Sequence, residues 1–184
     1  MSAHFELLLR WNKVLNLSAI RSKADIVERH YCESLFLAAT IPPRPMQIAD
    51  LGSGAGFPGI PLAIFRPDSA VWLVESHRRK SVFLREAARD IANVRVLSQR
   101  AEDVTEMFDC VVSRAVSLPN LQDWLVRHAG LVAFLGGAEP PLLSEFDWNA
   151  PIRMPWGDHR YVYSGRNVSR ETLVCDIGPT EPRP

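Results

Sequence analysis

The fold of this chain can be inferred from one segment, Met46-Gln-Ile-Ala-Asp50-Leu-Gly52-Ser-Gly54-Ala-Gly56. A short apolar run, 46–51, ends at three alternating glycines. Glycines allow the backbone to turn sharply and let a ligand approach without meeting a side chain. In open parallel sheets, ligands bind just beyond the carboxyl ends of the strands. The stretch therefore predicts a first strand followed by a ligand-binding turn.

The pattern of strand, turn and helix continues after this loop. Further strands are predicted at 70–75, 94–97, 108–113 and 131–135, with helices at 60–65, 79–91 and 118–129 between them. In the helix at 79–91 we expect Val82, Phe83, Ala87 and Ile91 to face inward. Strands that alternate with helices form a parallel sheet, because parallel neighbours need crossover connections. The fold class is therefore α/β, with a mostly parallel central sheet and helices on both faces.

Two other patterns flank this central part. Apolar residues recur at helical spacing in 4–17 and 24–39, and Ile41-Pro-Pro-Arg-Pro45 then ends any helix because proline lacks an amide donor. We expect a helical cap at 1–45, the main domain at 46–175 and a short tail at 176–184. Near the end of the main domain, 151–154 and 161–164 are predicted to form an antiparallel pair.

Length and composition set outer limits on the function. The chain has 184 residues, enough for one sizeable core, and is 47% hydrophobic and 23% charged, which is typical of a soluble globular domain. Its 21 basic and 21 acidic residues argue against a protein held on nucleic acid by bulk charge alone. The three cysteines are scattered, so we expect neither a disulfide framework nor a metal site. Neither a membrane span nor a secretory signal is predicted, and we expect a cytoplasmic protein.

Two classes of cofactor use a glycine loop in this position. The dinucleotide fingerprint needs a third glycine where this chain has Phe57, so that fingerprint fails. An acidic residue two positions before three alternating glycines, as Asp50 stands here, resembles motif I of S-adenosylmethionine-dependent methyltransferases. Glu75, which closes the second predicted strand, can accept both ribose hydroxyls, but its spacing would also suit NAD. The loop favours S-adenosylmethionine and leaves a dinucleotide as the alternative.

Motifs that the sequence does not contain narrow the methyl acceptor. Methyl transfer is an in-line displacement, so the enzyme mainly aligns donor and acceptor. After the fourth predicted strand the chain reads Ser113-Arg114-Ala115-Val116, without the Asn/Asp-Pro-Pro-aromatic motif of enzymes that methylate exocyclic amines. Cys110 lies inside an apolar strand, where we expect a core residue rather than the nucleophile of carbon-5 cytosine methylation. A ring nitrogen with a free lone pair, such as guanine N7, needs neither a base nor a nucleophile.

Several segments, taken in order, resemble one family. The chain has Arg10-Trp-Asn-Lys-Val-Leu-Asn-Leu-Ser-Ala-Ile-Arg21, Glu28-Arg-His30 and Glu33-Ser-Leu35, and then the glycine loop extended to Pro61. Glu75-Ser76, Arg79-Lys80, Phe83-Leu-Arg85, Arg100-Ala-Glu102 and Ser113-Arg-Ala115 follow. Together, over 10–135, they resemble the RsmG (GidB) family of small-subunit ribosomal RNA guanine-N7 methyltransferases, which act near the decoding centre.

The resemblance implies a Rossmann-like class I methyltransferase fold with S-adenosylmethionine as cofactor. It implies cofactor contacts at Gly52, Gly54, Gly56, Phe57, Glu75, Ala101, Glu102 and Arg114. It places Arg114 beside the departing methyl group, and we expect Arg114 and Arg100 to be the catalytic, positioning residues. Asp50 is expected to brace the loop rather than touch the cofactor. The implied substrate is guanine N7 in 16S ribosomal RNA, either free or within the ribosomal subunit, and we expect a monomer.

The chain also departs from the family pattern. Where the family has Leu-Lys-Gly, this chain has Leu135-Gly136-Gly137, and an expected Arg-His pair stands inverted as His159-Arg160. The basic residues that could face RNA phosphates are Arg21, Arg29, His30, Arg78, Arg79, Lys80 and Arg100. Because a positive charge is missing, a cofactor-binding RNA module with little turnover stays open as an alternative. A small-molecule methyltransferase is a further alternative.

Overall fold

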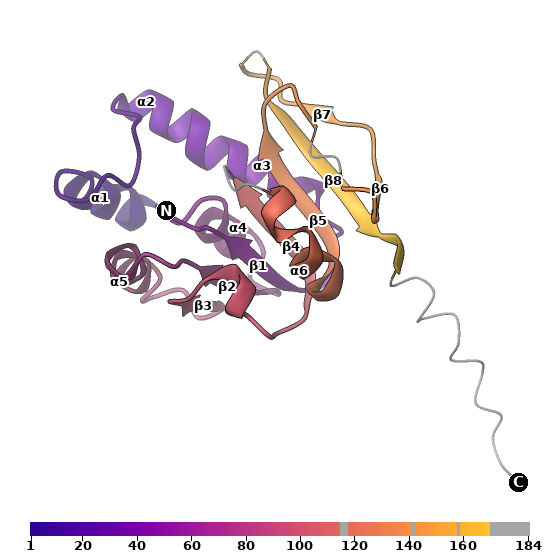
Figure 1. Cartoon of the computed structure of the whole chain (residues 1–184). Coiled ribbons are helices and arrows are strands. Elements are labelled where there is room, and N and C mark those ends of the chain that lie inside the picture. The colour runs from indigo at the N-terminus through magenta and orange to yellow at the C-terminus, as the bar shows by residue number, and fades with distance from the viewer. Residues whose placement is uncertain (115–117, 141–142, 158, 170–184) are drawn as a thin grey trace, which may run out of the picture.

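A single eight-stranded sheet forms the centre of the computed structural model, which describes residues 1–114, 118–140, 143–157 and 159–169. The strand order is β3-β2-β1-β4-β5-β8-β6, with β7 paired to β8 (Figure 1). The strands are β1 (Gln47–Leu51), β2 (Ala70–Val74), β3 (Val94–Leu97), β4 (Phe108–Arg114), β5 (Ala129–Gly136), β6 (Phe146–Trp148), β7 (Ile152–Arg153) and β8 (Tyr161–Asn167). The helices are α1 (Ser2–Trp11), α2 (Lys23–Ile26), the π-helical η1 (Val27–Cys32), α3 (Glu33–Thr40), α4 (Gly59–Phe65), α5 (Arg78–Ala87), the 3-10 turns η2 (Ala101–Asp103) and η3 (Leu118–Leu121), and α6 (Gln122–His128).

The sheet is parallel from β3 to β5 and antiparallel beyond β5. β1 pairs in parallel with both β2 and β4, and β8 runs antiparallel between β5 and β6. The winding direction therefore switches between β1 and β4, which is where open α/β sheets bind their ligands. This topology confirms the predicted fold class. The predicted antiparallel pair near the end of the domain is also confirmed, as β7 against β8.

Each face of the sheet has its own apolar core. On one face lie the helices α1 to α5, and Leu8, Leu37 and Phe83 are among their buried side chains (Figure 1). On the other face α6 packs Trp124 and Leu125 into a second core. The elements within 1–45 contribute directly to the first core, so the predicted cap region packs as part of the same layer as α4 and α5.

The first helix ends earlier than the sequence predicts. α1 stops at Trp11, and the side chain of Asn12 then holds the non-helical segment that follows. Its Oδ1 accepts hydrogen bonds from the amides of Leu17 and Ser18 at 2.9 and 3.0 Å, and its Nδ2 donates to the Ser18 carbonyl at 2.9 Å. The second predicted helix is confirmed as the consecutive run of α2, η1 and α3, whose middle part is π-helical.

One predicted inward residue of α5 faces outward. Val82 is 51% exposed, whereas Phe83 and Leu84 are fully buried. At about 100° per residue, Val82 shares its side of the helix with the exposed Arg79 and Arg85. The expectation for Val82 is therefore wrong. The buried face of α5 is narrower than the predicted set of inward residues.

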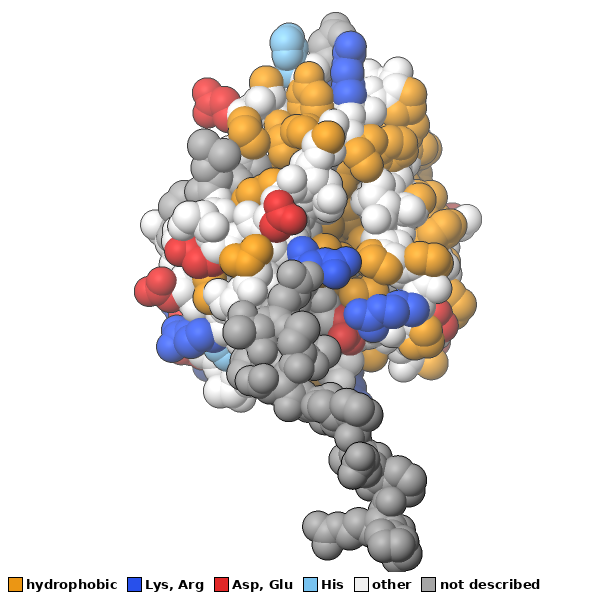
Figure 2. Space-filling model, turned by 90° about the vertical axis from the view of Figure 1, so that its right-hand side faces the viewer, with side chains coloured by type: hydrophobic (Ala, Val, Ile, Leu, Met, Phe, Trp, Pro, Cys, Tyr) orange, Lys and Arg blue, Asp and Glu red, His pale blue; other side chains and the backbone are white. Residues whose placement is uncertain are grey.

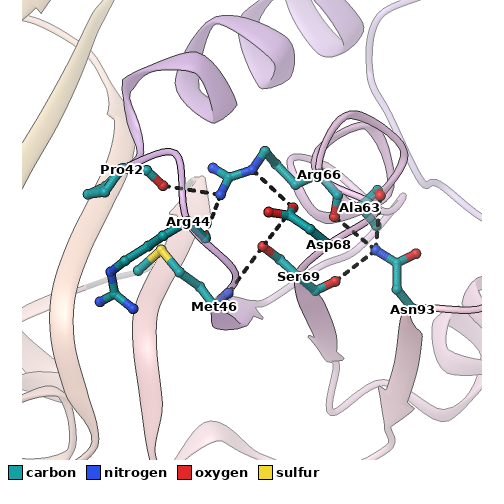
Figure 3. A network of polar contacts seen from close by, with 8 residues as sticks. All are labelled: Pro42, Arg44, Met46, Ala63, Arg66, Asp68, Ser69 and Asn93. Carbon is teal, nitrogen blue, oxygen red and sulfur yellow. Dashed lines mark hydrogen bonds and ion pairs between the residues drawn. The ribbon is translucent and has the colours of Figure 1, made fainter.

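A network of polar contacts joins the segments that lead into β1, β2 and β3 (Figure 3). The Arg66 guanidinium donates from Nη2 to the carbonyls of Pro42 and Arg44 at 3.1 and 2.6 Å. Asn93 donates from Nδ2 to the carbonyls of Ala63, Arg66 and Ser69 at 3.0, 3.1 and 2.8 Å. The network therefore fixes the amino ends of three strands, at the opposite edge of the sheet from the glycine loop.

Charge is distributed unevenly over the surface. On the side of the molecule beyond β6 and β8, the described basic side chains stand among acidic and apolar ones (Figure 2). At α5, by contrast, Arg78, Arg79, Lys80 and Arg85 lie within one helix.

None of the described helices has the length and apolarity needed to cross a membrane.

Candidate functional site

The loop after β1 makes the sharp turn that its glycines predict. Gly52, Gly54 and Gly56 have φ angles of 68°, 54° and 86°, a conformation that other residues rarely adopt. A Cβ on Gly56 would lie 2.5 Å from Ile60 Cδ1. The nearest atom to a Cβ on Gly54 is the Gly52 carbonyl oxygen, at 3.7 Å. The space beside Gly56 is therefore filled by the Ile60 side chain, whereas the space beside Gly54 is open to a ligand.

Asp50 lies beneath the loop and is completely buried. Its Oδ2 accepts a hydrogen bond from the Gly59 amide at 3.0 Å. Burial raises the pKa of Asp50 to about 7, although the bond from Gly59 opposes this shift. A Cβ on Gly59 would lie 2.6 Å from the same carboxylate oxygen, so α4 can begin there only with glycine. Asp50 thus braces the loop against α4.

Glu75 follows β2 directly and connects that strand to the loop. Its Oε2 accepts a hydrogen bond from the Gly54 amide at 3.0 Å, and its Oε1 accepts one from the His77 amide at 2.7 Å. The residue is only 7% exposed. A carboxylate has about four acceptor positions, so two hydroxyl groups can still bind beside these amides. This arrangement fits the predicted contact of Glu75 with ribose hydroxyls.

A pocket of about 280 Å³, which we call the β3-side pocket, lies next to Glu75 across the ends of β1, β2 and β3. Its lining includes Gly52, Ser76, Gln99, Arg100, Ala101 and Glu102. The structure therefore brings four of the predicted residues, from the glycine loop and from the segment after β3, to one cavity. Cofactor contact by these residues stays a prediction. The pocket lies directly beside the Glu75 carboxylate, between Val74 and Ser76 on one side and the segment after β3 on the other.

Phe57 belongs to an aromatic cluster beneath the loop. Its ring stacks on His30 with centroids 4.6 Å apart and meets Tyr31 edge-on at 4.9 Å. His4 is part of the same cluster: its Nε2 is 2.9 Å from the Ala55 carbonyl, and the Tyr31 hydroxyl is 3.0 Å from its Nδ1. Because the Phe57 ring is held by packing, a cofactor contact would have to come from its backbone.

Burial keeps both histidines of this cluster neutral. It lowers the pKa of His4 to about 4 and the pKa of His30 to about 3. His30 is 5% exposed, and its Nε2 is 2.7 Å from the Ser18 hydroxyl oxygen. The expectation that His30 faces RNA phosphates is therefore wrong, because the side chain packs inside the protein. The basic residues Arg21, Arg29, Arg78, Arg79 and Arg100 are exposed.

A second cavity, the β5-side pocket of about 380 Å³, opens beyond the ends of β4 and β5. Arg29, Glu33, Arg114, Gly136 and Arg160 are among its lining residues. Arg114 Nη1 donates to the Arg29 carbonyl at 2.8 Å, and its guanidinium lies over the Phe57 ring at 5.8 Å. Arg114 therefore connects the glycine loop to this pocket.

Glu33 carries the negative charge of the β5-side pocket. Its Oε1 is 2.5 Å from Arg160 Nη1, and its Oε2 is 3.9 Å from Arg114 Nη1. Burial raises the pKa of Glu33, and the two guanidinium groups oppose this shift. Sequence reasoning did not single out Glu33 as a site residue. The one sequence feature that could have indicated its role is its place in the Glu33-Ser-Leu35 segment. Its partner Arg160 lies far away in the sequence, so the pairing could not be predicted.

The structure places the two arginines that were expected to be catalytic, positioning residues in different pockets. Arg100 lines the β3-side pocket, whereas Arg114 lines the β5-side pocket. Cys110 is fully buried in β4, and burial raises the pKa of its thiol, as expected of a core residue. Ala115 and Val116, which belong to the sequence comparison after the fourth strand, lie outside the described residues.

The sheet order, the glycine loop and the acidic residue after β2 define a Rossmann-like methyltransferase fold. A methyltransferase from Aquifex aeolicus whose structure is described as SAM-dependent superposes with a TM-score of 0.58 at 15% identity, over 78% of this chain and 92% of its own. Residues 1–140 match the GidB family, described as rRNA small subunit methyltransferase G, and the chain belongs to that family.

Two relatives named ribosomal RNA small subunit methyltransferase G show how far the similarity extends. The protein from Dichelobacter nodosus is 48% identical over 132 residues, which are 70% of this chain and 61% of the relative. The protein from Xanthomonas campestris pv. campestris (strain B100) is 46% identical over 145 residues, 74% of this chain and 68% of the relative. The match thus spans 61% to 68% of the length of these two relatives. Family and fold both support S-adenosylmethionine as the cofactor.

Proposed function

We propose that this protein transfers the methyl group of S-adenosylmethionine to guanine N7 of small-subunit ribosomal RNA. The observation that carries the proposal is the pair of pockets on either side of the glycine loop. The β3-side pocket adjoins Glu75, and the β5-side pocket adjoins Arg114. A donor nucleoside in the first and an acceptor base in the second would meet at the ends of β1 and β4. The family match supports the class of substrate.

The residues of the β3-side half suit the adenosyl part of the cofactor. Glu75 offers acceptor positions to ribose hydroxyls, and Ala101 and Glu102 line the pocket in which the adenine would lie. Gly54 has space on its ligand side, and its amide is held by Glu75. When bound, the cofactor supplies an electrophilic methyl group on a sulfonium. The protein's part is to hold that group in line with the attacking nitrogen.

Guanine N7 suits the chemistry available in the β5-side pocket. N7 carries a free lone pair, so no proton has to leave the base before the methyl group is transferred. The histidine nearest to Arg114 in the aromatic cluster, His30, is buried and has a pKa of about 3, so it is a poor proton acceptor at neutral pH. The arginines of the pocket, Arg29, Arg114 and Arg160, suit the binding of an RNA nucleotide and its phosphates.

The lysine that is missing at the end of β5 does not leave this pocket without positive charge. Gly136 and Gly137 stand where the family has Lys-Gly, and Arg160 lines the same pocket. This placement favours an active enzyme over a binding module with little turnover. We further propose small-subunit RNA or the subunit itself as the partner, and action as a monomer in the cytoplasm without a metal.

A methyl-transfer assay with radiolabelled S-adenosylmethionine tests the proposal. We expect small ribosomal subunits or their RNA to become labelled, and nucleoside analysis to find the label in 7-methylguanosine. Label in adenosine, cytidine or protein would contradict the proposed acceptor. Activity that survives ribonuclease treatment of the substrate would instead favour a small-molecule acceptor. Saturable cofactor binding without any product would favour the binding module.

A further inference from the structure

The β5-side pocket contains a carboxylate for which the proposed methyl transfer gives no role. Glu33 begins α3, and its side chain is 2% exposed. Burying a carboxylate is costly unless it is paired, and here two guanidinium groups from distant elements compensate it. Arg114 ends β4, and Arg160 immediately precedes β8. A charged triad at the wall of an RNA-nucleotide pocket is suited to ligand recognition as well as to holding the elements together.

The two oxygens of Glu33 have different surroundings. Arg160 Nη1 donates a hydrogen bond to Oε1 at 2.5 Å. Oε2 is 3.9 Å from Arg114 Nη1, which is longer than a hydrogen bond, and Arg114 directs that same nitrogen to the Arg29 carbonyl. Arg160 therefore forms a hydrogen bond with Oε1, whereas Oε2 has only a longer ion-pair contact with Arg114. An acceptor in this position suits a ligand that brings its own hydrogen-bond donors.

We infer that Glu33 determines base specificity by accepting hydrogen bonds from the Watson–Crick edge of the target guanine. This inference rests on the proposed function of the β5-side pocket. Guanine presents two adjacent donors on that edge, N1–H and the N2 amine, whereas adenine, cytosine and uracil each present a single donor group there, with an acceptor next to it. Enzymes that act on an extruded base commonly read this edge by hydrogen bonds. A buried carboxylate, which only accepts, matches guanine and opposes the other three bases.

The placement also agrees with methylation at N7. In guanine, N7 lies on the opposite side of the ring system from the Watson–Crick edge. A base whose Watson–Crick edge faces Glu33 would therefore direct N7 away from α3. Arg114, which lines the pocket beside Glu33, reaches the glycine loop through its contact with Phe57. The edge of the base that carries N7 would thus point towards the glycine loop, where the cofactor would bind.

The test compares guanosine with inosine, which lacks the N2 amine. Small subunits are reconstituted with 16S RNA that carries either nucleoside at the position methylated by the wild-type protein. Because a hydrogen bond to a charged group is lost, we expect the wild-type kcat/KM to fall by about tenfold or more with inosine. In Glu33→Gln, Arg160 retains the side-chain carbonyl oxygen, so the amide NH2 replaces Oε2 and faces the donors of guanine. Methylation of guanosine should then fall by about tenfold or more, while methylation of inosine falls less, and the discrimination disappears.

The controls separate recognition from folding. Glu6→Gln makes the same chemical change at an exposed position of α1, and we expect it to preserve both the activity and the discrimination. Thermal unfolding and S-adenosylmethionine affinity of Glu33→Gln show whether the triad is needed for folding, and Glu33→Asp, which keeps the charge, should retain a preference for guanosine.

Two results would overturn the inference: equal wild-type rates on guanosine and inosine, or an equal loss of both rates in Glu33→Gln. If the wild-type protein makes no 7-methylguanosine, the proposed function fails instead. Binding then decides the inference separately, by NMR titration with GMP and IMP in the presence of S-adenosylhomocysteine. A wild-type preference for GMP that Glu33→Gln abolishes supports the role of Glu33, and equal binding of both nucleotides overturns it.

Discussion

The carboxylate of Glu75 holds the amide of Gly54, with 3.0 Å between Oε2 and the nitrogen. The acid at the end of β2 therefore fixes the middle of the glycine loop and at the same time borders the β3-side pocket. One side chain thus shapes the loop and offers acceptors to a ligand. These two tasks respond differently to substitution.

Glu75→Ala should weaken S-adenosylmethionine binding by about tenfold to a hundredfold, because hydrogen bonds to a charged acceptor are lost on both the loop and the ligand. Glu75→Gln keeps one acceptor oxygen and should bind more tightly than Glu75→Ala. Isothermal titration calorimetry measures both constants. An unchanged affinity in Glu75→Ala would remove this residue from the cofactor site.

Gly54→Ala and Gly56→Ala should fail in different ways. At Gly56 a Cβ meets Ile60, so the substitution should lower the free energy of unfolding. At Gly54 the protein leaves space, so the variant should lose more cofactor affinity than stability, apart from the cost of about 1 kcal/mol for a positive φ. Urea unfolding and calorimetry on both variants check the contrast. Equal stability losses without an effect on binding would contradict it.

Arg100→Ala and Arg114→Ala should separate binding from turnover. Arg100 lines the β3-side pocket, so its loss should raise the Kd of S-adenosylmethionine. Arg114 lines the β5-side pocket, so its loss should lower kcat on ribosomal subunits with a smaller change in that Kd. Stability must be measured in parallel, since Arg114 also compensates the buried Glu33. A normal kcat in Arg114→Ala would exclude Arg114 from the reaction.

His4 should make the protein less stable in mild acid. Its pKa falls from 6.5 to about 4 on folding because of burial, so the unfolded chain binds the proton more readily. Stability is therefore present above pH 6.5 and decreases as the pH falls towards 4. Between pH 7.5 and 5.5 this histidine alone should cost about 1.4 kcal/mol. Asp50, whose pKa is raised to about 7, acts in the opposite direction.

The contribution of His4 is measured by difference. Urea unfolding is measured for the wild-type protein and for His4→Gln at both pH values. Subtracting one pH dependence from the other cancels the contributions of the other titrating groups, which both proteins share. We expect the loss of stability between pH 7.5 and 5.5 to be smaller in His4→Gln by about the same 1.4 kcal/mol. Parallel curves for the two proteins would show that His4 does not titrate as its burial requires.

Asn93→Ala should destabilise the fold and leave the site unchanged. Its amide donates to three carbonyls at the amino ends of the strands, so we expect a loss of about 1–3 kcal/mol. Asn93→Asp should not restore stability, because a carboxylate would face those carbonyl oxygens. Chemical denaturation gives the stability, and calorimetry should find normal cofactor affinity in the folded protein.

Much of the fold was predictable because its signals are local. The strand at 94–97 has the predicted bounds, and the glycine loop lies where β1 ends. The residues that line the β3-side pocket come from short segments after neighbouring parallel strands, which the order of elements already places at one edge. Local patterns of this kind do not depend on contacts with distant residues.

The parts that were not predicted depend on contacts between distant residues. β6 has only three residues and exists because it pairs with β8. The segment after α1 is held by the side chain of Asn12, and the outward position of Val82 depends on which side of α5 packs on the sheet. Glu33 and Arg160 are 127 residues apart, and their contact forms only when β8 returns along β5. Each of these features therefore needs the tertiary structure.

The division of the core into two layers also distributes the five tryptophans. Trp11 and Trp156 pack on the side of α1 to α5, whereas Trp72, Trp124 and Trp148 pack on the side of α6. Their fluorescence consequently reports on both halves of the interior. Variants that keep the indoles of one layer only would show, during denaturation, which half loosens first.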